Sequence, residues 1–463
     1  MSDPRWHPPS SQPSPPVGGR RGYGGDASKN PLTPQRGERA GERGAPAREL
    51  SPSEPIPKAK APISQKLWIM LICGVLVVLI GNGVRLTFGI LLKPIAFDLE
   101  ISRETFGLVI AMQALLYGAF QPIAGILADR FGAVIVITVG ALLYAGGLFL
   151  ASMASSSLEL SISLGLLVGI GLSGATNVIV LGAIARVVPA ERRGIVFGTV
   201  IAAGSLGMFI FAPAVQAIMQ AFGWRETLLA LAALILVSPL MAQGLRAAKA
   251  GAGAAVQTAR QSLSDATYEA ARHPGYLLLT AGFFVCGFHV TFISTHFPAY
   301  LQDNGVSASA TSYAFGAIGL CNIAGAYIFG ALSDKFSKKS VLTLIYLLRA
   351  VLMTIILISP MTDMTAIMFG ALMGLLWLST VPLTSGIVAQ VFGPAHFSFL
   401  FGIVFMGHQF GGFTGAWLGG RIYDMTGSYD IMWMISIGLG LVSAMLHWPI
   451  RDQPLPRLGA VPA

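Results

Sequence analysis

The sequence predicts an all-α membrane protein in which twelve transmembrane helices form two pseudo-symmetric six-helix bundles. Three observations predict this class: the apolar composition, the number of long apolar segments, and a pattern of residues repeated in the two halves of the chain. Of 463 residues, 54% are hydrophobic and only 11% are charged. This is the composition of a membrane protein rather than of two or three soluble domains.

Twelve apolar segments are long enough to cross a bilayer, which takes about 20 residues for each helix. They cover residues 67–92, 104–128, 133–153, 160–186, 194–219, 227–244, 275–297, 308–332, 340–359, 364–389, 397–419 and 430–449. The only long polar connection splits them six and six. We therefore expect an N-terminal bundle over 63–244, a cytoplasmic central loop over 245–274, a C-terminal bundle over 275–450 and a cytoplasmic tail over 451–463.

The first 62 residues contribute +4 of the formal net charge of +9. Their arginines are scattered among proline, glycine and serine without interleaved aromatic residues. Such a segment buries too little apolar surface to fold, so we expect residues 1–62 to form a disordered cytoplasmic tail. The pattern does not indicate nucleic-acid binding.

The basic residues that flank the spans predict the orientation of the chain. Four lie on one side, namely Lys93, Arg103, Arg225 and Arg421. Sixteen lie on the other side, namely Lys58, Lys60, Lys66, Arg130, Arg186, Arg192, Arg193, Arg246, Lys249, Arg260, Arg272, Lys335, Lys338, Lys339, Arg451 and Arg457. Because cytoplasmic loops carry the excess of lysine and arginine, both termini are expected in the cytoplasm of a multi-pass protein of the inner (cell) membrane.

The two halves of the chain are related in sequence. The segment GILADRF, from Gly125 to Phe131, recurs 205 residues later as GALSDKF, from Gly330 to Phe336. At an offset of 204 or 205, further glycines recur as the pairs Gly165/Gly370, Gly169/Gly374, Gly198/Gly402, Gly207/Gly411 and Gly223/Gly427. A nearly constant offset through several helices indicates a duplicated six-helix unit, and such repeats place a substrate site between the halves.

An arginine interrupts the first apolar span, in the segment GNGVRLTFGILLKP. At the 204-residue offset, Arg85 corresponds to His289. A guanidinium facing lipid costs several kcal/mol, so a chain that keeps one there usually gives it water, a partner or a ligand. We expect Arg85 and His289 to face a shared central cavity.

The two repeated loops, GILADRFG and GALSDKFSKK, each resemble the signature G-x-L-x-D-[RK]-x-G-[RK]-[RK] of the major facilitator superfamily. The resemblance covers residues 67–449 and implies the fold of that family. It also implies that a conformational latch is formed by Gly125, Asp129, Arg130, Gly132, Gly330, Asp334 and Lys335. Glycine at Gly125 and Gly330 is expected to let a neighbouring helix approach closely.

The segments VRLTFGILLKPIAFDLEISRE and FGWRETLLALAALIL are similar to helix 1 and the loop into helix 6 of monocarboxylate porters and oxalate/formate exchangers. The resemblance implies a small carboxylate as substrate. Those relatives typically use a basic residue in helix 8 or 11. Here helix 8 has Asn322 as its strong polar group, and helix 11 has His408 and Gln409.

Five basic residues lie within the spans, namely Arg85, His289, His296, Arg349 and His408, and no aspartate or glutamate lies well inside any span. A cavity that contains cations and no carboxylate prefers anions. Each residue also has a structural interpretation. Arg85 can bond to Asn82, a buried neutral histidine can be satisfied by a hydroxyl, and Arg349 is better explained by a structural pair or a lipid headgroup.

Uncharged polar residues at helical spacing are candidate lining groups. They form three stripes, namely Gln113, Tyr117 and Gln121, then Ser173, Thr176 and Asn177, then Trp377, Thr380 and Thr384. Helices 1, 4, 7 and 10 line the pathway in the family that the chain resembles. We therefore expect substrate contact or gating from Asn82, Asn177, Trp377, Thr380, Tyr117 and Asn322, along with Arg85, His289, His408 and Gln409.

No G-x-x-x-x-G-K-[ST] phosphate loop occurs, so the predicted function is secondary transport of a small organic anion, as a monomer and without cofactor or metal. The coupling is either proton symport, with the proton on His289 or on the substrate, or anion exchange. Efflux of drugs or toxic metabolites is the alternative transport function. Two other classes stay open, namely an intramembrane protease that uses the GLSG motif at 171–174 and a sensor built on a transporter fold.

Overall fold

The computed structural model describes residues 65–185, 187–188, 190–248, 262–393 and 396–456, and these residues form helices joined by turns. We call α1 to α10 the first half. Its elements are α1 (Gln65–Arg85), η1 (Phe88–Leu91), α2 (Leu92–Asp98), α3 (Arg103–Phe131), α4 (Ala133–Ser152), α5 (Ser157–Leu160), η2 (Ser161–Leu167), α6 (Val168–Gly174), α7 (Asn177–Ala185), α8 (Ala190–Phe222), α9 (Trp224–Ile235) and α10 (Ser238–Ala242).

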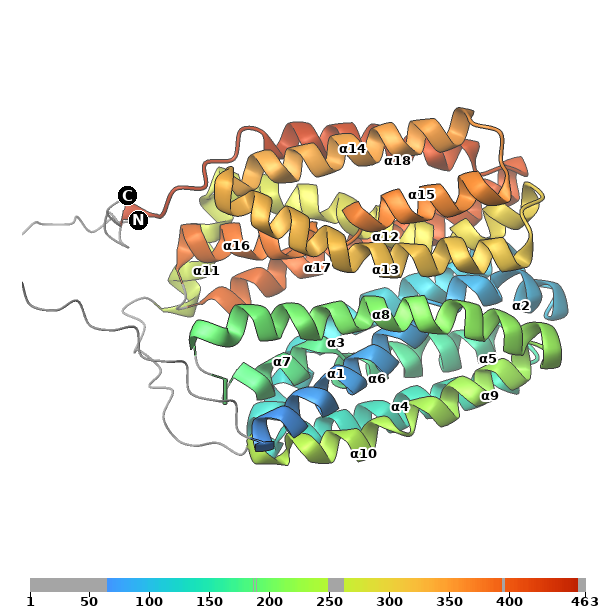
Figure 1. Ribbon diagram of the computed structural model, residues 1–463, viewed down its shortest axis with the longest axis horizontal. Helices are drawn as coiled ribbons and strands as arrows, with labels where there is room; N and C mark the ends of the chain where they lie inside the picture. Colours follow the sequence, from blue (N-terminus) through green and yellow to red (C-terminus); the bar gives the residue numbers. More distant parts are fainter. Residues whose placement is uncertain (1–64, 186, 189, 249–261, 394–395, 457–463) are drawn as a thin grey trace, which may run out of the picture. The chain divides into compact units, whose positions relative to one another are not determined.

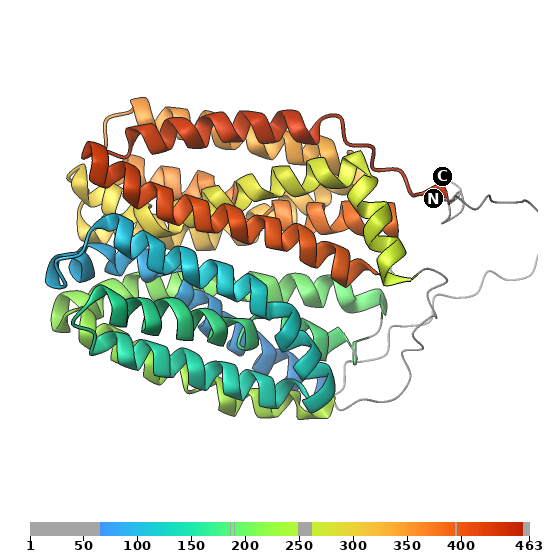
Figure 2. The same ribbon diagram turned by 180° about the vertical axis from the view of Figure 1, so that it is seen from behind.

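The second half comprises α12 to α18. After η3 (Gln243–Ala248) and α11 (Leu263–Arg272), the chain forms α12 (Pro274–Asp303), α13 (Ala308–Lys335), α14 (Lys338–Ile358), α15 (Asp363–Leu376), α16 (Thr380–Phe392), α17 (Phe397–Thr426) and α18 (Asp430–His447). α14 packs beside α18 along one edge of this half, and α4 packs beside α9 in the first half (Figures 1 and 2).

The helices confirm the predicted fold class. Within the described residues, eleven segments are long and apolar enough to span a bilayer. The 30-residue helix α17 is the further long helix that brings the count to the predicted twelve. The polar side chains of His408 and Gln409 lie in the middle of α17.

The helices run between two ends of the molecule. The end where α1 begins and α18 finishes is called the terminal end, and the other is called the opposite end. Within the predicted central loop over 245–274, residues 263–272 fold as α11. Ser262 accepts a bond from the backbone N–H of Asp265 and so caps this helix at its start. The predicted tail over 1–62, residues 249–261 of the loop and residues 457–463 lie outside the described residues.

Four predicted spans are broken, where the sequence indicated continuous helices over 67–92, 160–186, 227–244 and 364–389. The span 227–244 is broken at residues 236–237, shortly before Pro239, and the other three are broken at residues 86–87, 175–176 and 377–379. At each of these three breaks a hydroxyl donates to a carbonyl three or four residues earlier: Thr87 to Val84, Thr176 to Leu172, and Ser379 to Leu375. Such side-chain bonds compete with the helical ladder and bend helices.

The break between α15 and α16 is held by two side chains. The Arg349 guanidinium on α14, which is buried, donates to the carbonyls of Leu376, at 2.6 Å from Nη2, and Trp377. A cation at the negative C-terminal end of a half-helix is favourable. Asn322 Oδ1 accepts from the Leu378 N–H at 2.8 Å. Arg349 therefore has the structural pairing expected from the sequence, and not a lipid headgroup.

The two halves join along two helix pairs, α3 with α17 and α8 with α13. A Cβ added to Gly107 on α3 would collide with the Ala416 carbonyl on α17, and one added to Gly118 would lie 2.6 Å from Gln409 Cγ. On α13, a Cβ on Gly319 would lie 2.9 Å from the Phe209 nitrogen on α8. These backbones are in close contact from the opposite end to the middle.

The same helix faces separate toward the terminal end. Gly125 lies about two turns beyond Gly118 on α3, and Gly402 lies about two turns before Gln409 on α17. On the second helix pair, Gly330 and Gly198 lie about three turns from Gly319 and Phe209. Among the described residues, nothing lies within 4 Å of a Cβ built on any of these four glycines. The close approach of a helix that the sequence predicts at Gly125 and Gly330 is not found among the described residues.

Candidate functional site at the break in the first helix

Arg85 is the last residue of α1, half-buried beside the break. Its guanidinium carbon lies 5.4 Å from the centroid of the Tyr117 ring on α3, which is a cation–π contact. Its Nε atom is buried and has no hydrogen-bond partner. Within the described part of the chain, no carboxylate pairs with this guanidinium. Arg85 therefore carries a positive charge that the surrounding protein does not neutralise.

Four polar side chains of the first half form two hydrogen-bonded pairs, and one of them, Tyr117, also contacts Arg85. We call Arg85, Asn82, Tyr117, Thr176 and Asn177 the Arg85 cluster. The Asn82 amide on α1 donates to Asn177 Oδ1 at the start of α7. The Thr176 hydroxyl donates to the Tyr117 hydroxyl at 3.3 Å. Because Asn82 pairs with Asn177, the considered bond between Arg85 and Asn82 is not formed. The structure thus brings together four of the predicted site residues from helices far apart in sequence.

A cavity of about 10 Å³ lies next to Arg85, on the side of the opposite end. That volume holds about one water molecule. The cavity is lined by Arg85, Leu86, Phe88, Gly89, Ile110, Gln113, Ala114, Thr291, Ser294 and Thr295. The lining residues come from both halves. The contact between the halves on this side therefore separates the Arg85 cluster from the opposite end.

α17 supplies the wall of the second half nearest to the cluster. The Phe405 ring meets the Tyr117 ring edge-on at 6.2 Å and stacks on the His408 ring at 5.5 Å. His408 Nδ1 lies 3.1 Å from Gln409 Oε1, and the Gln409 amide donates to the Ala114 carbonyl on α3 at 3.0 Å. His408 and Gln409 therefore lie at the junction of the halves, one aromatic ring away from Tyr117.

His289 does not lie where the sequence predicted. Its Nε2 lies 2.9 Å from the Ser436 carbonyl on α18, its Nδ1 has no partner in the described residues, and Arg349 is a close charge. The prediction that His289 shares a cavity with Arg85 is wrong, because the ring points into the interior of the second half. Equal offset places two residues at equal depth but does not fix the direction of unlike side chains.

Three other predicted residues of the second half have partners within the protein. Thr380 Oγ1 lies 3.1 Å from Cys286 Sγ. The Trp377 carbonyl accepts from Arg349, while its indole N–H is buried without a partner among the described residues. Asn322 donates to the Ser205 hydroxyl on α8 at 2.6 Å and so connects the halves. None of these three contacts the Arg85 cluster in this structure.

The latch residues are only partly visible. The Asp129 and Asp334 side chains lie outside what the structure describes. Arg130 is exposed over the Phe131 ring, at 5.3 Å, and Lys335 is exposed. Gly132 has φ of +93° in the turn between α3 and α4, a conformation that glycine adopts most readily. The latch itself stays a prediction.

Ser173, the serine of the GLSG motif, is bonded within its own helix. Its hydroxyl donates to the Ile170 carbonyl at 2.6 Å. No described histidine forms a hydrogen bond with it. Nucleophilic catalysis requires a base within hydrogen-bond reach of the serine, so this geometry does not support a protease site.

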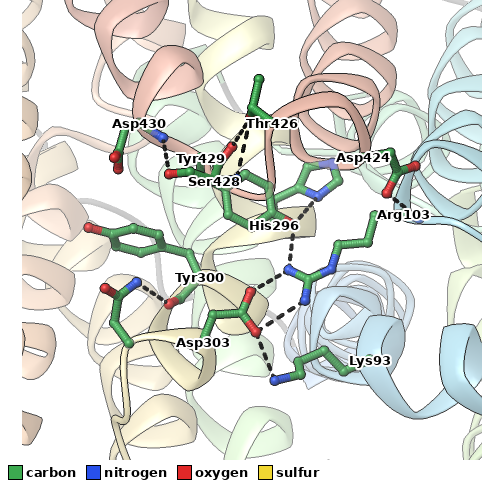
Figure 3. Close-up of polar contacts among 11 residues, drawn as sticks. Lys93, Arg103, His296, Tyr300, Asp303, Asp424, Thr426, Ser428, Tyr429 and Asp430 are labelled. Carbon is green, nitrogen blue, oxygen red and sulfur yellow. Dashed lines mark hydrogen bonds and ion pairs between the residues drawn. The ribbon is translucent and has the colours of Figure 1, made fainter.

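Sequence reasoning missed a polar cluster at the opposite end, which Figure 3 shows. Arg103 at the start of α3 donates to both oxygens of Asp303 at the end of α12, at 2.5 and 3.1 Å, and to the Tyr429 hydroxyl at 3.1 Å. Lys93 donates to Asp303 at 2.9 Å. Glu104 of α3 accepts from Arg421 of α17 at 3.0 Å. The signal available in the sequence was that these charges flank spans of different halves.

Comparisons with known proteins agree with the fold. The chain is 25% identical over 397 residues to the uncharacterized MFS-type transporter YcxA of Bacillus subtilis, covering 83% of this chain and 96% of that one. It is 24% identical to monocarboxylate transporter 12-B of Danio rerio, over 70% of this chain and 74% of the relative. These are remote similarities that extend over most of each chain.

Solved structures show the same fold at lower identity. A bacterial homologue of the human lysosomal transporter Spinster, inward-facing and unoccupied, matches with a TM-score of 0.65 at 15% identity, over 83% of this chain and 94% of that one. A mutant of the nucleoside transporter NupG matches with a TM-score of 0.66 at 15% identity, over 83% and 99%. The sequence profile described as Major Facilitator Superfamily matches residues 70–380 and 279–461. The helices, the duplication and this match together show that the chain belongs to the major facilitator superfamily.

Proposed function

We propose that this protein is a secondary transporter that moves a small organic anion, a mono- or dicarboxylate, across the membrane by alternating access, as a monomer. The observation that carries the proposal is Arg85, a half-buried guanidinium with an aromatic neighbour and no anionic partner in the described chain. A transported carboxylate supplies the missing partner.

The charges around the site favour an anion. Among the described residues, no aspartate or glutamate is buried, whereas Arg349 and several histidines are. Opposite charges attract strongly where water is scarce, and a guanidinium binds a carboxylate with two parallel hydrogen bonds. A cationic substrate would meet repulsion from Arg85 without a compensating carboxylate.

The neighbours of Arg85 suit the rest of a small polar anion. Asn82 and Asn177 offer amide groups, and Tyr117 offers a hydroxyl on the ring that faces the guanidinium. Further groups that accept or donate lie on α17, at His408 and Gln409. In the proposed cycle the second half approaches these groups when the substrate is bound.

The substrate reaches Arg85 from the terminal end. There the glycines Gly125 and Gly402 have open space on the faces that are in close contact nearer the opposite end. The excess of basic residues at the terminal end supports a cytoplasmic location for it. The relatives named monocarboxylate transporters support a carboxylate as substrate.

Counterflow in proteoliposomes tests the proposal. Vesicles loaded with one compound from a panel of mono- and dicarboxylates exchange it for the labelled form, and each carboxylate is compared with its neutral amide and with an amine of the same carbon skeleton. The expected result is exchange of one or more carboxylates and of no amide or amine. Exchange of apolar cations alone would contradict the proposal and favour drug efflux. Dependence on an imposed pH gradient separates proton symport from anion exchange.

Thiol labelling of intact cells tests the orientation. Met153 lies at the opposite end and is 64% exposed, and Leu263 on α11 lies at the terminal end and is 47% exposed. A membrane-impermeant maleimide is expected to label Met153→Cys from outside and to label Leu263→Cys only after the cells are opened. The reverse pattern would place the terminal end outside the cell.

A further inference from the structure

The carboxylate of Asp303 lies in a complete two-cation site. Arg103 binds it through both terminal nitrogens, at 2.5 Å from Nη1 to Oδ2 and 3.1 Å from Nη2 to Oδ1. Lys93 Nζ lies 2.9 Å from Oδ1. Figure 3 shows the three side chains pointing toward one another. A bidentate guanidinium with an added ammonium is a strong and specific arrangement for a carboxylate.

Side chains on both flanks hold Arg103 in position. The Tyr423 ring of α17 lies 3.6 Å from the guanidinium carbon, and the Tyr429 hydroxyl accepts from Nη1 at 3.1 Å. Behind Tyr429, the buried His296 ring lies with Nδ1 3.1 Å from the hydroxyl and Nε2 2.7 Å from the Ala416 carbonyl. The side chain of Arg103 is only 14% exposed. The site is therefore built and partly shielded from water.

The cations and the carboxylate belong to different halves. Lys93 and Arg103 lie on α2 and α3 of the first half, together with Arg85 of α1, whereas Asp303 ends α12 of the second half. Other contacts across the same junction run from Glu104 to Arg421 and from the backbone nitrogens of Arg103 and Glu104 to Asp424. When the halves separate at this end, Asp303 leaves and the two cations stay together.

We propose that Lys93 and Arg103 form a second carboxylate-binding site at the opposite end, which Asp303 occupies as a tethered ligand while this end is closed. Its ligand class is a free carboxylate anion. Filling of the site by Asp303 holds the halves together, and release of Asp303 exposes the site on the half that also carries Arg85. The next step rests on the proposed function: a transported anion that arrives from this end replaces Asp303 and then moves on to Arg85.

Chemical rescue with formate tests the site without any transport measurement. Spin labels are attached to cysteines that replace Leu158 on α5 and Met364 on α15. These two residues lie at the opposite end, one in each half, and are 68% and 65% exposed. The distances between the labels are measured by pulsed electron paramagnetic resonance in lipid nanodiscs, on a protein whose native cysteines are replaced by alanine. Asp303→Ala vacates the site, and sodium formate is compared with sodium chloride at the same ionic strength.

The expected results follow from filling and emptying the site. Asp303→Ala shifts the distribution toward longer distances, because the closed form then shields two cations from water without an anion beside them. Formate supplies that anion and is expected to restore the short distances, since a ligand stabilises the form to which it binds best, here the closed form in which Tyr423 and Tyr429 of the second half also hold Arg103. Chloride restores little. Asp303→Asn also lengthens the distances but does not respond to formate, since its amide fills the space. This second variant tests the proposal if Asp303→Ala fails to fold.

Asp98 provides a matched control on the same end of the protein. Its carboxylate accepts from Arg225 at 3.0 Å and from the Trp224 indole at 3.2 Å, all within the first half. Asp98→Ala is expected to leave the distances unchanged with or without formate. Unchanged distances in both Asp303 variants would overturn the proposal, as would equal recovery in chloride and formate. Because no substrate is used, these results are independent of whether carboxylate counterflow succeeds.

Discussion

The guanidinium carbon of Arg85 lies 5.4 Å from the ring centroid of Tyr117, and the two residues come from different helices of the first half. The ring attracts the cation without neutralising it, since a cation–π contact contributes about 0.5–2 kcal/mol. An anion is thus still required to neutralise the guanidinium. The Tyr117 hydroxyl, which bonds to Thr176 and Gln121, fixes the ring in place.

Removing the Tyr117 ring is expected to weaken substrate binding. Tyr117→Leu loses the cation–π contact and lets Arg85 move, so the KM of counterflow is expected to rise by about 3- to 30-fold, which corresponds to the energy of such a contact. Tyr117→Phe keeps the ring and is the control, with a KM within about 3-fold of wild type. Equal effects of the two substitutions would show that the hydroxyl matters and the ring does not.

Replacing Arg349 is expected to destabilise the protein rather than to change its specificity. Arg349→Gln cannot reach the carbonyls of both Leu376 and Trp377, and a buried acceptor left without a partner costs about 1–3 kcal/mol. The melting temperature in detergent is expected to fall, whereas the order of preference among carboxylates stays the same. A changed preference with unchanged stability would place Arg349 in the substrate site.

Filling the open space at Gly402 is expected to block the transport cycle. No described atom lies within 4 Å of a Cβ added to Gly402 of α17, on the face where α17 contacts α3 nearer the opposite end. In the other state of the cycle this end closes, so the side chain of Gly402→Leu holds the halves apart. Counterflow is expected to fall more than tenfold with little change in stability.

The control for Gly402→Leu is Gly438→Leu. Gly438 on α18 also has open space around it, but it lies outside the junction of the halves. This variant is expected to transport at nearly the wild-type rate. Wild-type transport by Gly402→Leu would contradict closure at the terminal end.

His289 is not expected to carry the coupled proton. Its Nε2 lies 2.9 Å from the Ser436 carbonyl in the interior of the second half, away from the Arg85 cluster. His289→Gln keeps a donor for that carbonyl, so the dependence of uptake on an imposed pH gradient is expected to match that of wild type. Loss of the gradient dependence with preserved exchange would return His289 to the role first predicted for it.

The sequence predicted helices and duplication well because both leave periodic signals. Long apolar runs give the spans, and the recurring glycines, such as Gly207 and Gly411, give the two halves. Both glycines prove to be points of close backbone approach, where an added Cβ would collide with the Leu79 and Phe284 carbonyls. The same reasoning found Arg85, Asn82, Asn177 and Tyr117, which the fold brings together.

The parts that the sequence did not predict depend on side-chain direction and on distant partners. A hydroxyl in an apolar run gives no sign that it breaks the helix, as Thr87 and Ser379 do. Asp303, the ion-pair partner of Arg103, lies 200 residues away in the sequence. No short sequence pattern can therefore reveal that the two residues are in contact. His289 sits at the predicted depth, but its ring turns toward α18.

The most direct test of the account is the charge of Arg85. Counterflow of the best carboxylate is compared between wild type, Arg85→Lys and Arg85→Gln, with Arg272→Gln as the control because Arg272 lies exposed on α11. We expect Arg85→Gln to lose exchange, Arg85→Lys to keep a reduced rate because an ammonium cannot bind in bidentate fashion, and the control to match wild type. Normal exchange by a folded Arg85→Gln protein would contradict the central claim that this guanidinium binds the anion.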